Sequence, residues 1–331
     1  STSKNRKVQT VRSMRKRDIA LAITGGLGAA VAVKMLTRAR TVDWGNVAGK
    51  VPLSEHSHFV NVEGARLHYQ EFGDAACPTL VLLHGFTASV FVWHKVAPML
   101  ADAGFHVIAV DLVGFGYSEK PRWFDYTIAS QARVVTRFMN TLGIGRATLV
   151  GSSYGGAVAM TIALDYPEYV EKLVLLDAVI NDEALSHPIL RLASIPGVGE
   201  TITPFLVDSR IMMRHRMRGS LAKPNHELIT NERISNVLRP LSAADGHHSV
   251  LATSRAWSAN RIEKDAHLIN QPTLVIWGEE DTVIGIHNGY KLYESILHSR
   301  FVILKNCGHV PAEEKSDLVS ELVTEFCHDR K

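Results

Sequence analysis

A strand-like run at 147–150 leads directly into the motif Gly-x-Ser-x-Gly at 151–155, and a stretch of small residues typical of a helix follows it. A serine hydroxyl is a weak nucleophile at neutral pH, so catalysis requires it to lie close to a base and to backbone N–H donors. A sharp turn from strand to helix provides both, because Gly151 and Gly155 have no Cβ and let the two elements approach closely. The motif therefore predicts Ser153 as a nucleophile held in a strained turn.

Several other apolar runs predict a mainly parallel sheet around this turn. The 331 residues are 46% apolar, which is enough for a large core, and one α/β domain with an insertion fits better than two equal domains. Two early runs flank Glu63-Gly64, a hairpin-type turn, and a helix is predicted over 128–142. The predicted strands are 58–62, 65–72, 79–83, 106–110, 147–150, 173–176, 273–277 and 301–304.

The loop after the strand at 79–83 reads His84-Gly85-Phe86. Where a serine lies in a turn of this kind, a loop after an early strand supplies one backbone N–H to the developing oxyanion, and the residue after the nucleophile supplies the other. The backbone N–H groups of Phe86 and Tyr154 are therefore the predicted oxyanion donors. His84 is predicted to have a structural role, bonding within its own loop.

The nucleophile needs an acid and a base later in the chain, in the order Ser, Asp, His. Glu280 and Asp281 follow the penultimate predicted strand, where a carboxylate can accept a hydrogen bond from the histidine and fix its tautomer. Asp281 is the predicted acid, with Glu280 and Asp177 as alternatives. His309 follows the last predicted strand and so lies at the same edge of the sheet, which makes it the predicted base.

The amino terminus combines positive charge with an apolar segment. Residues 1–17 form a basic tail, and residues 18–37 are predicted to form a membrane-anchor helix. A basic cluster beside an apolar helix suits an anionic membrane surface. The uncharged run at 19–33 is shorter than the roughly 20 residues that span a bilayer, so the predicted location is a membrane, through a single-pass or monotopic anchor. The side of the membrane stays open, although the basic tail favours a cytoplasmic amino terminus.

Other interpretations of this segment compete. A secretory signal and an organellar transit peptide share its basic and apolar character. A dinucleotide-binding turn is disfavoured, because the third glycine of its pattern is missing. Ala22, Gly26 and Ala30 form a row of small residues that would allow a homodimer through the anchor helix, and a weakly hydrophobic anchor explains the same residues.

Residues 179–260 differ in character from the rest, because strand signals are absent and prolines, histidines and arginines are frequent. This stretch is predicted to be a helical lid over the active site. Its segment 210–218 is rich in methionine and arginine, which suits an acyl chain with an anionic headgroup. A solvated charged face with a few core methionines is the alternative. His247 and His248 are predicted to lie in a loop.

Composition argues against several classes of function. The net charge is only +3 and the basic cluster lacks interleaved aromatic residues, so nucleic acid is not a predicted partner. Cys77, Cys307 and Cys327 lack metal-ligand spacing and are predicted to be unpaired. No metal and no organic cofactor are predicted. The predicted segments are a basic tail (1–17), an anchor (18–37), a connector (38–55), a first core part (56–178), a lid (179–260) and a second core part (261–331).

Four separated motifs occur in a fixed order: the loop at 84–86, the serine turn at 151–155, the acid loop at 277–281 and the histidine loop at 306–309. With these motifs, residues 56–331 resemble the α/β-hydrolase superfamily. The anchor makes the whole chain similar to membrane-anchored monoacylglycerol lipases and single-helix bacterial phospholipase A enzymes. The resemblance implies a mostly parallel sheet flanked by helices, and cleavage of carboxylic esters in glycerolipids without a metal or an organic cofactor.

The resulting hypothesis is a membrane-associated serine hydrolase that forms an acyl-enzyme on Ser153. Its predicted partner is a lipid or small ester, such as a monoacylglycerol, a lysophospholipid or a phospholipid. Carbon–carbon bond hydrolases and perhydrolases of this fold also use serine and stay open, whereas related dehalogenases and epoxide hydrolases carry Asp at this position. A membrane-tethered binding or assembly subunit with an idle hydrolase domain is the alternative from another class.

Overall fold

The computed structural model describes residues 39–183 and 194–329. The chain separates into two units, residues 1–39 and 40–331, and the fold below is that of the second. The predicted basic tail and anchor helix, with the predicted pairing of anchor helices, lie outside the described residues. In the part of the chain that is described, no helix is both long and apolar enough to cross a membrane.

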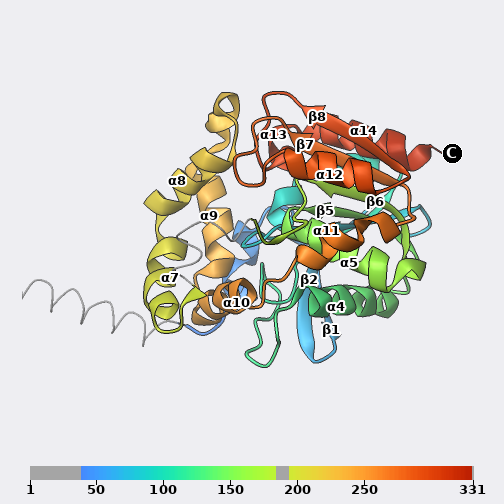
Figure 1. The fold of residues 1–331 in the computed structure, drawn as a ribbon. Helices are drawn as coiled ribbons and strands as arrows, with labels where there is room; N and C mark the ends of the chain where they lie inside the picture. The colour runs from blue at the N-terminus through green and yellow to red at the C-terminus, as the bar shows by residue number, and fades with distance from the viewer. Residues whose placement is uncertain (1–38, 184–193, 330–331) are drawn as a thin grey trace, which may run out of the picture. The chain divides into compact units, whose positions relative to one another are not determined.

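A mixed sheet of eight strands forms from the described residues (Figure 1). In spatial order the strands are β1 (Ser57–Val62), β2 (Ala65–Phe72), β4 (His106–Val110), β3 (Thr79–Leu83), β5 (Ala147–Ser152), β6 (Val170–Leu176), β7 (Thr273–Gly278) and β8 (Ser299–Leu304). Strands β3 to β8 run parallel, and β2 pairs antiparallel with both β1 and β4. The loops that follow the parallel strands therefore gather at one edge.

Helices lie on both faces of this sheet and beside it, with short 3-10 turns between some of them (Figure 1). They are α2 (Trp44–Val47), α3 (Val96–Asp102), α4 (Ile128–Thr141), α5 (Tyr154–Asp165), α7 (Val198–Asp208), α8 (Arg210–Ser220), α9 (Asn231–Leu238), α10 (Ala244–Arg255), α11 (Asn260–Asp265), α12 (His287–Ser295), α13 (Pro311–Glu314) and α14 (Ser316–His328).

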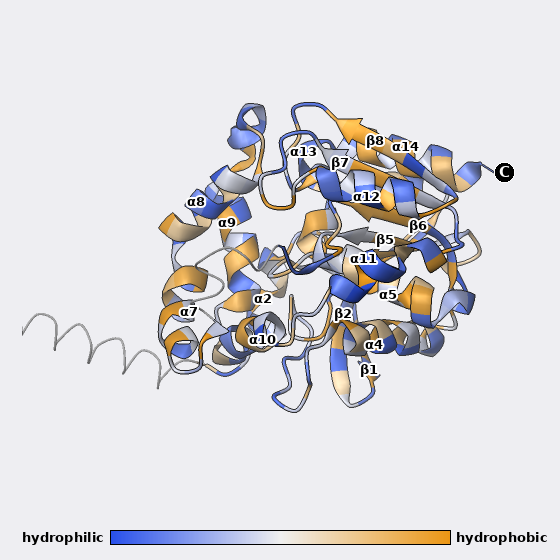
Figure 2. Cartoon of the chain, in the orientation of Figure 1, coloured by the Kyte–Doolittle hydropathy of each residue, from blue (hydrophilic) through white to orange (hydrophobic). Residues whose placement is uncertain are grey.

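The core consists of two hydrophobic layers, one on each face of the sheet. Along β3 the side chains alternate, so that Leu80 and Leu82 pack with α3 and α14, whereas Val81 and Leu83 pack with α4 and α5. A strand buried on both faces appears in the sequence as a continuous apolar run. Figure 2 shows hydrophobic residues along strands such as β6, whereas α11 and α12 carry many hydrophilic residues.

The predicted strands and the predicted helix at 128–142 are confirmed, with differences at the ends. Strands β6 and β8 begin at Val170 and Ser299, before the apolar runs that predict them. Ser299 and Arg300 pair with Thr273 and Leu274 of β7. Because β8 is an edge strand, it keeps polar side chains in solvent and part of its length lacks the apolar signal.

The hairpin predicted at Glu63-Gly64 is confirmed, because β1 and β2 pair antiparallel with Val62 opposite Ala65. Glu63 has a φ of 48° and Gly64 a φ of 84°. Two successive residues with positive φ are typical of the tight turn that matches the twist of a hairpin.

The described residues between β6 and β7 form helices, and α7 to α10 lie beside the sheet (Figure 1). The prediction of a loop at His247 and His248 is wrong, since both lie within α10. The start of α10 lies so close to the residues before it that a Cβ at Gly246 would be 2.7 Å from the Leu241 carbonyl oxygen. The ring of His247 bonds to Asp208 at 2.9 Å, which joins α10 to α7.

Replacing Gly155 tests how tightly the serine turn packs on the sheet. A Cβ at this position would lie 2.1 Å from the Leu83 carbonyl oxygen, so Gly155→Ala requires a backbone shift. We expect the free energy of unfolding to fall by about 1–3 kcal/mol, as measured by urea denaturation. Gly145→Ala is the control, because a Cβ there meets nothing within 4 Å. Equal losses in the two variants would contradict this packing argument.

Candidate active site

Loops after five parallel strands carry the predicted chemical groups to one edge of the sheet. Phe86 follows β3, Ser153 follows β5, Asp177 follows β6, Asp281 follows β7 and His309 follows β8. The carboxyl ends of adjacent parallel strands lie side by side. Ser153 and His309, which are 156 positions apart in the chain, therefore become neighbours.

Ser153 lies in a sharp turn between β5 and α5. Its φ of 51° and ψ of −115° are values that L-residues rarely adopt, at a cost on the order of 1–3 kcal/mol. The surrounding backbone holds the turn, because the Ser153 N–H donates to Leu176 at 2.9 Å and its carbonyl accepts from Val179 at 3.0 Å. A Cβ at Gly151 would lie 2.6 Å from the Cα of Gly156, so glycine is required for this close approach.

Ser153, His309 and Asp281 are joined by two hydrogen bonds. The Nε2 of His309 lies 3.0 Å from the Ser153 Oγ, and its Nδ1 lies 2.7 Å from Oδ2 of Asp281. In the tautomer that satisfies both contacts, Nδ1–H donates to Asp281 and Nε2 accepts the serine O–H. Asp281 is buried, and its Oδ1 accepts the N–H groups of Val283 and Ile284. A fixed imidazole with a free lone pair toward a hydroxyl is the arrangement of a general base.

The three carboxylates considered for the acid differ in their contact with His309. Asp281 bonds to the ring, whereas Glu280 is exposed to solvent. An oxygen of Asp177 lies within 4.8 Å of both His309 and Asp281, without a hydrogen bond to either ring nitrogen. The geometry therefore favours Asp281 over both alternatives.

Asp177 is a second buried carboxyl at this site. Its Oδ1 accepts the N–H of Gly278 at 2.9 Å, while its Oδ2 has no hydrogen-bond partner among the described residues. Burial, and then the charge of Asp281, raise the pKa of Asp177 well above its usual value. Its proton is therefore held more tightly than that of an ordinary carboxyl group. No local pattern in the sequence indicates this contact, which arises because β6 and β7 are adjacent in the sheet.

The loop after β3 lies against the serine turn. A Cβ at Gly85 would lie 3.2 Å from the Ser153 Cβ and 3.7 Å from its Oγ. The backbone N–H groups of Phe86 and Tyr154 have no hydrogen-bond acceptor in the described part of the chain. Tyr154 is the first residue of α5, where N–H groups have no partner within the helix. Two unused donors beside a hydroxyl suit the stabilisation of an oxyanion.

His84 is buried and braces this loop. Its Nδ1 donates to the Gly85 carbonyl at 2.8 Å, and its Nε2 accepts the N–H of Leu112 at 3.1 Å. Burial lowers the pKa of His84, which suits the neutral ring that these two bonds require. The prediction that His84 bonds within its own loop is confirmed.

A cavity of about 560 Å³ opens at Ser153 and is lined by the loops at the sheet edge and by helices α7, α8 and α10. One face of α8 turns toward it, whereas Arg210, Arg214 and Arg218 lie on the other face. The methionines at 212, 213 and 217 thus face the cavity, while binding of an acyl chain there stays a prediction. The α8 residues that line the cavity are Met212, Met213, His215, Arg216, Met217, Gly219 and Ser220.

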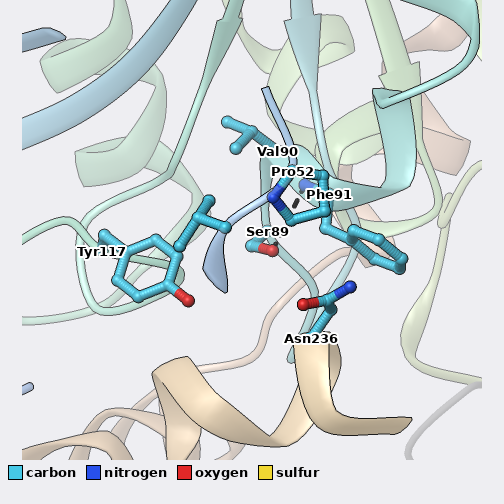
Figure 3. Close-up of a pocket in the computed structure, with 7 residues that line it drawn as sticks. Pro52, Ser89, Val90, Phe91, Tyr117 and Asn236 are labelled. Atoms are coloured by element: carbon cyan, nitrogen blue, oxygen red, sulfur yellow. Dashed lines mark hydrogen bonds between the residues drawn. The ribbon is translucent and has the colours of Figure 1, made fainter. Parts of the chain in front are cut away.

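Figure 3 shows a different and much smaller pocket, between the connector and the loop after β3. Pro52, Ser89, Tyr117 and Asn236 are among the residues that line it, and its volume is about 10 Å³. This volume is close to the lower limit for one water molecule. The pocket is too small for an organic substrate, and none of the three hydrogen-bonded side chains lines it.

Asp177, Asp281 and His309 also meet the spacing of a metal site, because one ligand atom from each lies within 4.8 Å of the others. Both nitrogens of His309 are engaged in hydrogen bonds, and Oδ1 of Asp281 accepts two backbone N–H groups. An ion at this position would have to displace the bond from Ser153 to His309 or the bond from His309 to Asp281. The three cysteines are free thiols, as predicted, and Cys307 is buried beside His309.

Over residues 78–316, the chain matches the family described as alpha/beta hydrolase fold. The chain belongs to this family. It is 31% identical to an uncharacterised hydrolase of Bacillus subtilis over 269 residues, which cover 80% of this chain and 95% of that protein. It is 28% identical to a 2-hydroxy-6-oxononadienedioate/2-hydroxy-6-oxononatrienedioate hydrolase of Paraburkholderia phymatum, over 82% of this chain and 95% of that protein.

A crystal structure of a membrane phospholipase A, described as a bacterial virulence factor, is also similar. It is 25% identical with a TM-score of 0.69, and the alignment covers 95% of this chain and 98% of that one. The relatives of this α/β hydrolase thus act on different bonds. Membership of the family determines the fold, whereas the substrate depends on the residues that form the site.

Replacing Asp177 by Asn tests whether its carboxyl is protonated in the folded protein. A raised pKa means that the folded state keeps its proton while the unfolded chain loses it, so this residue lowers stability as pH rises above about 4. Asn cannot ionise, so the stability of Asp177→Asn relative to the wild type should increase from about pH 5 to pH 8. Urea denaturation at several pH values measures this difference, and a difference independent of pH would show that Asp177 is ionised in both states.

Proposed function

We propose that this protein is a serine hydrolase that cleaves carboxylic esters through an acyl-enzyme on Ser153. The observation that carries the proposal is the 3.0 Å contact between the Ser153 Oγ and the His309 Nε2, with Asp281 on the far side of the ring. The unused N–H groups of Phe86 and Tyr154 support the same reaction. The chemistry needs no group beyond these side chains and a water molecule.

In the first step, His309 accepts the Ser153 proton while the Oγ attacks the ester carbonyl. The carbonyl oxygen gains negative charge, and the N–H groups of Phe86 and Tyr154 stabilise it by about 3 kcal/mol each. His309 then gives the proton to the leaving alcohol. The hydrogen bond to Asp281 stabilises the imidazolium that exists between these two transfers.

In the second step, water replaces the alcohol and attacks the acyl-enzyme. His309 accepts a proton from this water, and the same N–H groups stabilise the second oxyanion. Collapse of the intermediate returns the proton to Ser153 and releases the acid. The strained turn helps both steps, because it keeps the Oγ at the sheet edge while the backbone stays fixed.

We propose that the ester belongs to a lipid. The methionine face of α8 supports this, because methionine adapts to flexible apolar chains and the cavity is large enough for an acyl group. The similar structure named as a membrane phospholipase A supports it as well.

Cleavage of a carbon–carbon bond is the second candidate, since a similar protein from Paraburkholderia phymatum is named for a hydroxy-oxo-dienedioate substrate. Serine hydrolases of this fold can direct the same nucleophile at a ketone carbonyl. A panel of p-nitrophenyl esters, monoacylglycerols, lysophospholipids and a hydroxy-oxo-dienoate separates the candidates, and peracid formation with hydrogen peroxide tests the perhydrolase alternative. Turnover of the dienoate alone would replace the ester proposal.

We also propose that residues 1–37 hold the protein at a membrane. The basic tail followed by an apolar run supports this, and so does the similarity to a protein named as a membrane phospholipase A. An ester hydrolase at the surface of a bilayer would meet lipid substrates directly.

Ser153→Ala should lower kcat for p-nitrophenyl ester hydrolysis by at least about four orders of magnitude, because it removes the attacking atom. The wild type should also react covalently with a fluorophosphonate probe, and the variant should not. Unreactive wild-type protein would favour the idle binding subunit. Activity retained by a folded Ser153→Ala variant would show that another residue is the nucleophile.

Asp281→Asn and Glu280→Gln are a matched pair of variants that test which residue is the acid that bonds to His309. The first should lower kcat by about 10⁴-fold, because an amide holds the wrong tautomer of His309. The second should keep kcat within about twofold, since Glu280 is exposed and has no contact with the ring. The assignment of the acid would be wrong if the two variants lost activity equally.

Sedimentation with lipid vesicles tests the proposed membrane association. The full chain should pellet with vesicles that contain an anionic lipid, and a variant with Gln at every Lys and Arg of residues 1–17 should bind more weakly, with less dependence on salt. A variant without residues 1–37 should stay in the supernatant. If this shortened variant bound vesicles as strongly as the full chain, the membrane contact would have to lie in the rest of the chain.

A further inference from the structure

The cavity at Ser153 carries an excess of positive charge. Among the described residues that line it, two have guanidinium groups, Arg216 and Arg233, and one has a carboxylate, Glu313. Arg233 and Glu313 pair with each other through two bonds of 2.7 and 2.8 Å. Their charges compensate each other, and that of Arg216 does not have a counterpart in the lining.

The Arg216 side chain makes one hydrogen bond to the described protein, from Nη2 to the Thr87 Oγ1 at 3.1 Å. A guanidinium has five N–H groups, so most of its donors have no protein acceptor. Arg216 has no carboxylate partner among the described residues. The undescribed stretch 184–193 contains no Asp or Glu in its sequence. The charge therefore has no evident role in holding the fold together.

Arg216 is exposed, and its side chain faces the cavity. The protein atoms around the guanidinium lower its pKa by desolvation, so it is more weakly hydrated than a side chain on an open surface. No carboxylate among the described residues balances its charge. An anion that entered the cavity would replace the missing interaction, and a guanidinium bonds well to carboxylate and phosphate oxygens.

Arg216 also lies close to the reacting groups. Thr87, its hydrogen-bond partner, is next to the proposed oxyanion donor Phe86. One turn further along α8, the Ser220 carbonyl accepts the backbone N–H of His309 at 2.7 Å. Arg216 thus bonds to the loop that carries Phe86, and the end of its helix bonds to the loop that carries His309.

Arg233 adds a second unused donor to the same cavity. Its side chain is 9% exposed, and its Nη1 has no hydrogen-bond partner in the described part of the chain. A buried N–H group without an acceptor is unfavourable unless water or a ligand completes it. The lining thus contains the exposed guanidinium of Arg216 and one unpaired, buried N–H group on Arg233.

We propose that Arg216 binds an anionic group of the substrate, a carboxylate or a phosphate, so that the preferred substrates are esters with a negative charge near the scissile bond. This inference rests on the proposed ester hydrolysis and specifies its substrate class. Arg216 determines specificity and takes no part in bond breaking. The carboxylate of a dicarboxylic half-ester and the phosphate of a lysophospholipid supply the same chemistry, and the experiment separates them.

The test compares two matched pairs of esters, each with an anionic and a neutral member. The first pair is the p-nitrophenyl half-ester of glutaric acid and p-nitrophenyl pentanoate, and the second is oleoyl lysophosphatidate and monooleoylglycerol. The wild type should hydrolyse the anionic member of at least one pair with a kcat/KM about ten- to a hundredfold higher, as expected for hydrogen bonds to a charged group. The pair that shows this preference identifies a carboxylate or a phosphate as the ligand.

Three variants of α8 assign that preference. Arg216→Gln should abolish it, lowering kcat/KM for the anionic ester about ten- to a hundredfold more than for its neutral partner, and Arg216→Lys should retain part of it. Arg218→Gln is the matched control, because it removes the same charge from the same helix outside the cavity lining. Equal losses on neutral and anionic esters in Arg216→Gln, or no preference in the wild type, would overturn the proposal.

A binding measurement on an inactive variant tests the anion site independently of the proposed reaction. In Ser153→Ala protein, calorimetry should show tighter binding of decanoate or decyl phosphate than of decanol, and Arg216→Gln in the same background should remove the difference. This result would support the anion site even if every ester in the panel were inert, which would instead contradict the proposed function. Equal binding of the acids and the alcohol would overturn the anion site while leaving ester hydrolysis intact.

Discussion

The close approach of the serine turn to the strands beside it is the constraint on which the rest of the site depends. A Cβ at Gly155 would overlap the Leu83 carbonyl, and one at Gly85 would press on Ser153. Without these contacts the loop after β3 and the start of α5 could not reach the same point. The glycines therefore place two backbone donors beside one hydroxyl. The packing of the core on both faces of the sheet offsets the strain of this turn.

The order of the strands then determines which carboxyl has which role. Strand β7 lies between β6 and β8, so Asp281 comes next to His309 while Asp177 is held behind it. Two ionised carboxylates buried this close would repel each other. Burial and the charge of Asp281 raise the pKa of Asp177, which lessens that repulsion.

The helices between β6 and β7 connect substrate binding to the reacting groups. Helix α8 lines the cavity with methionines and Arg216, and its end bonds to the backbone of His309 through Ser220. Insertions at this point of a sheet commonly shape the pocket for substrate. Here the inserted helix also buttresses the proposed base, so changes in its packing would affect both binding and turnover.

The sequence by itself determined the strands, the hairpin at Glu63-Gly64 and the serine turn, because those follow from local apolar runs and from backbone conformations that glycine favours. It also indicated Asp281 and His309, since residues that follow parallel strands must meet at one edge. Only the tertiary structure decided between Asp281, Glu280 and Asp177, showed which arginine of α8 faces the cavity, and put His247 into a helix. Those outcomes depend on strand order and on which side of a helix meets a neighbour, and neither is encoded in any short stretch of residues.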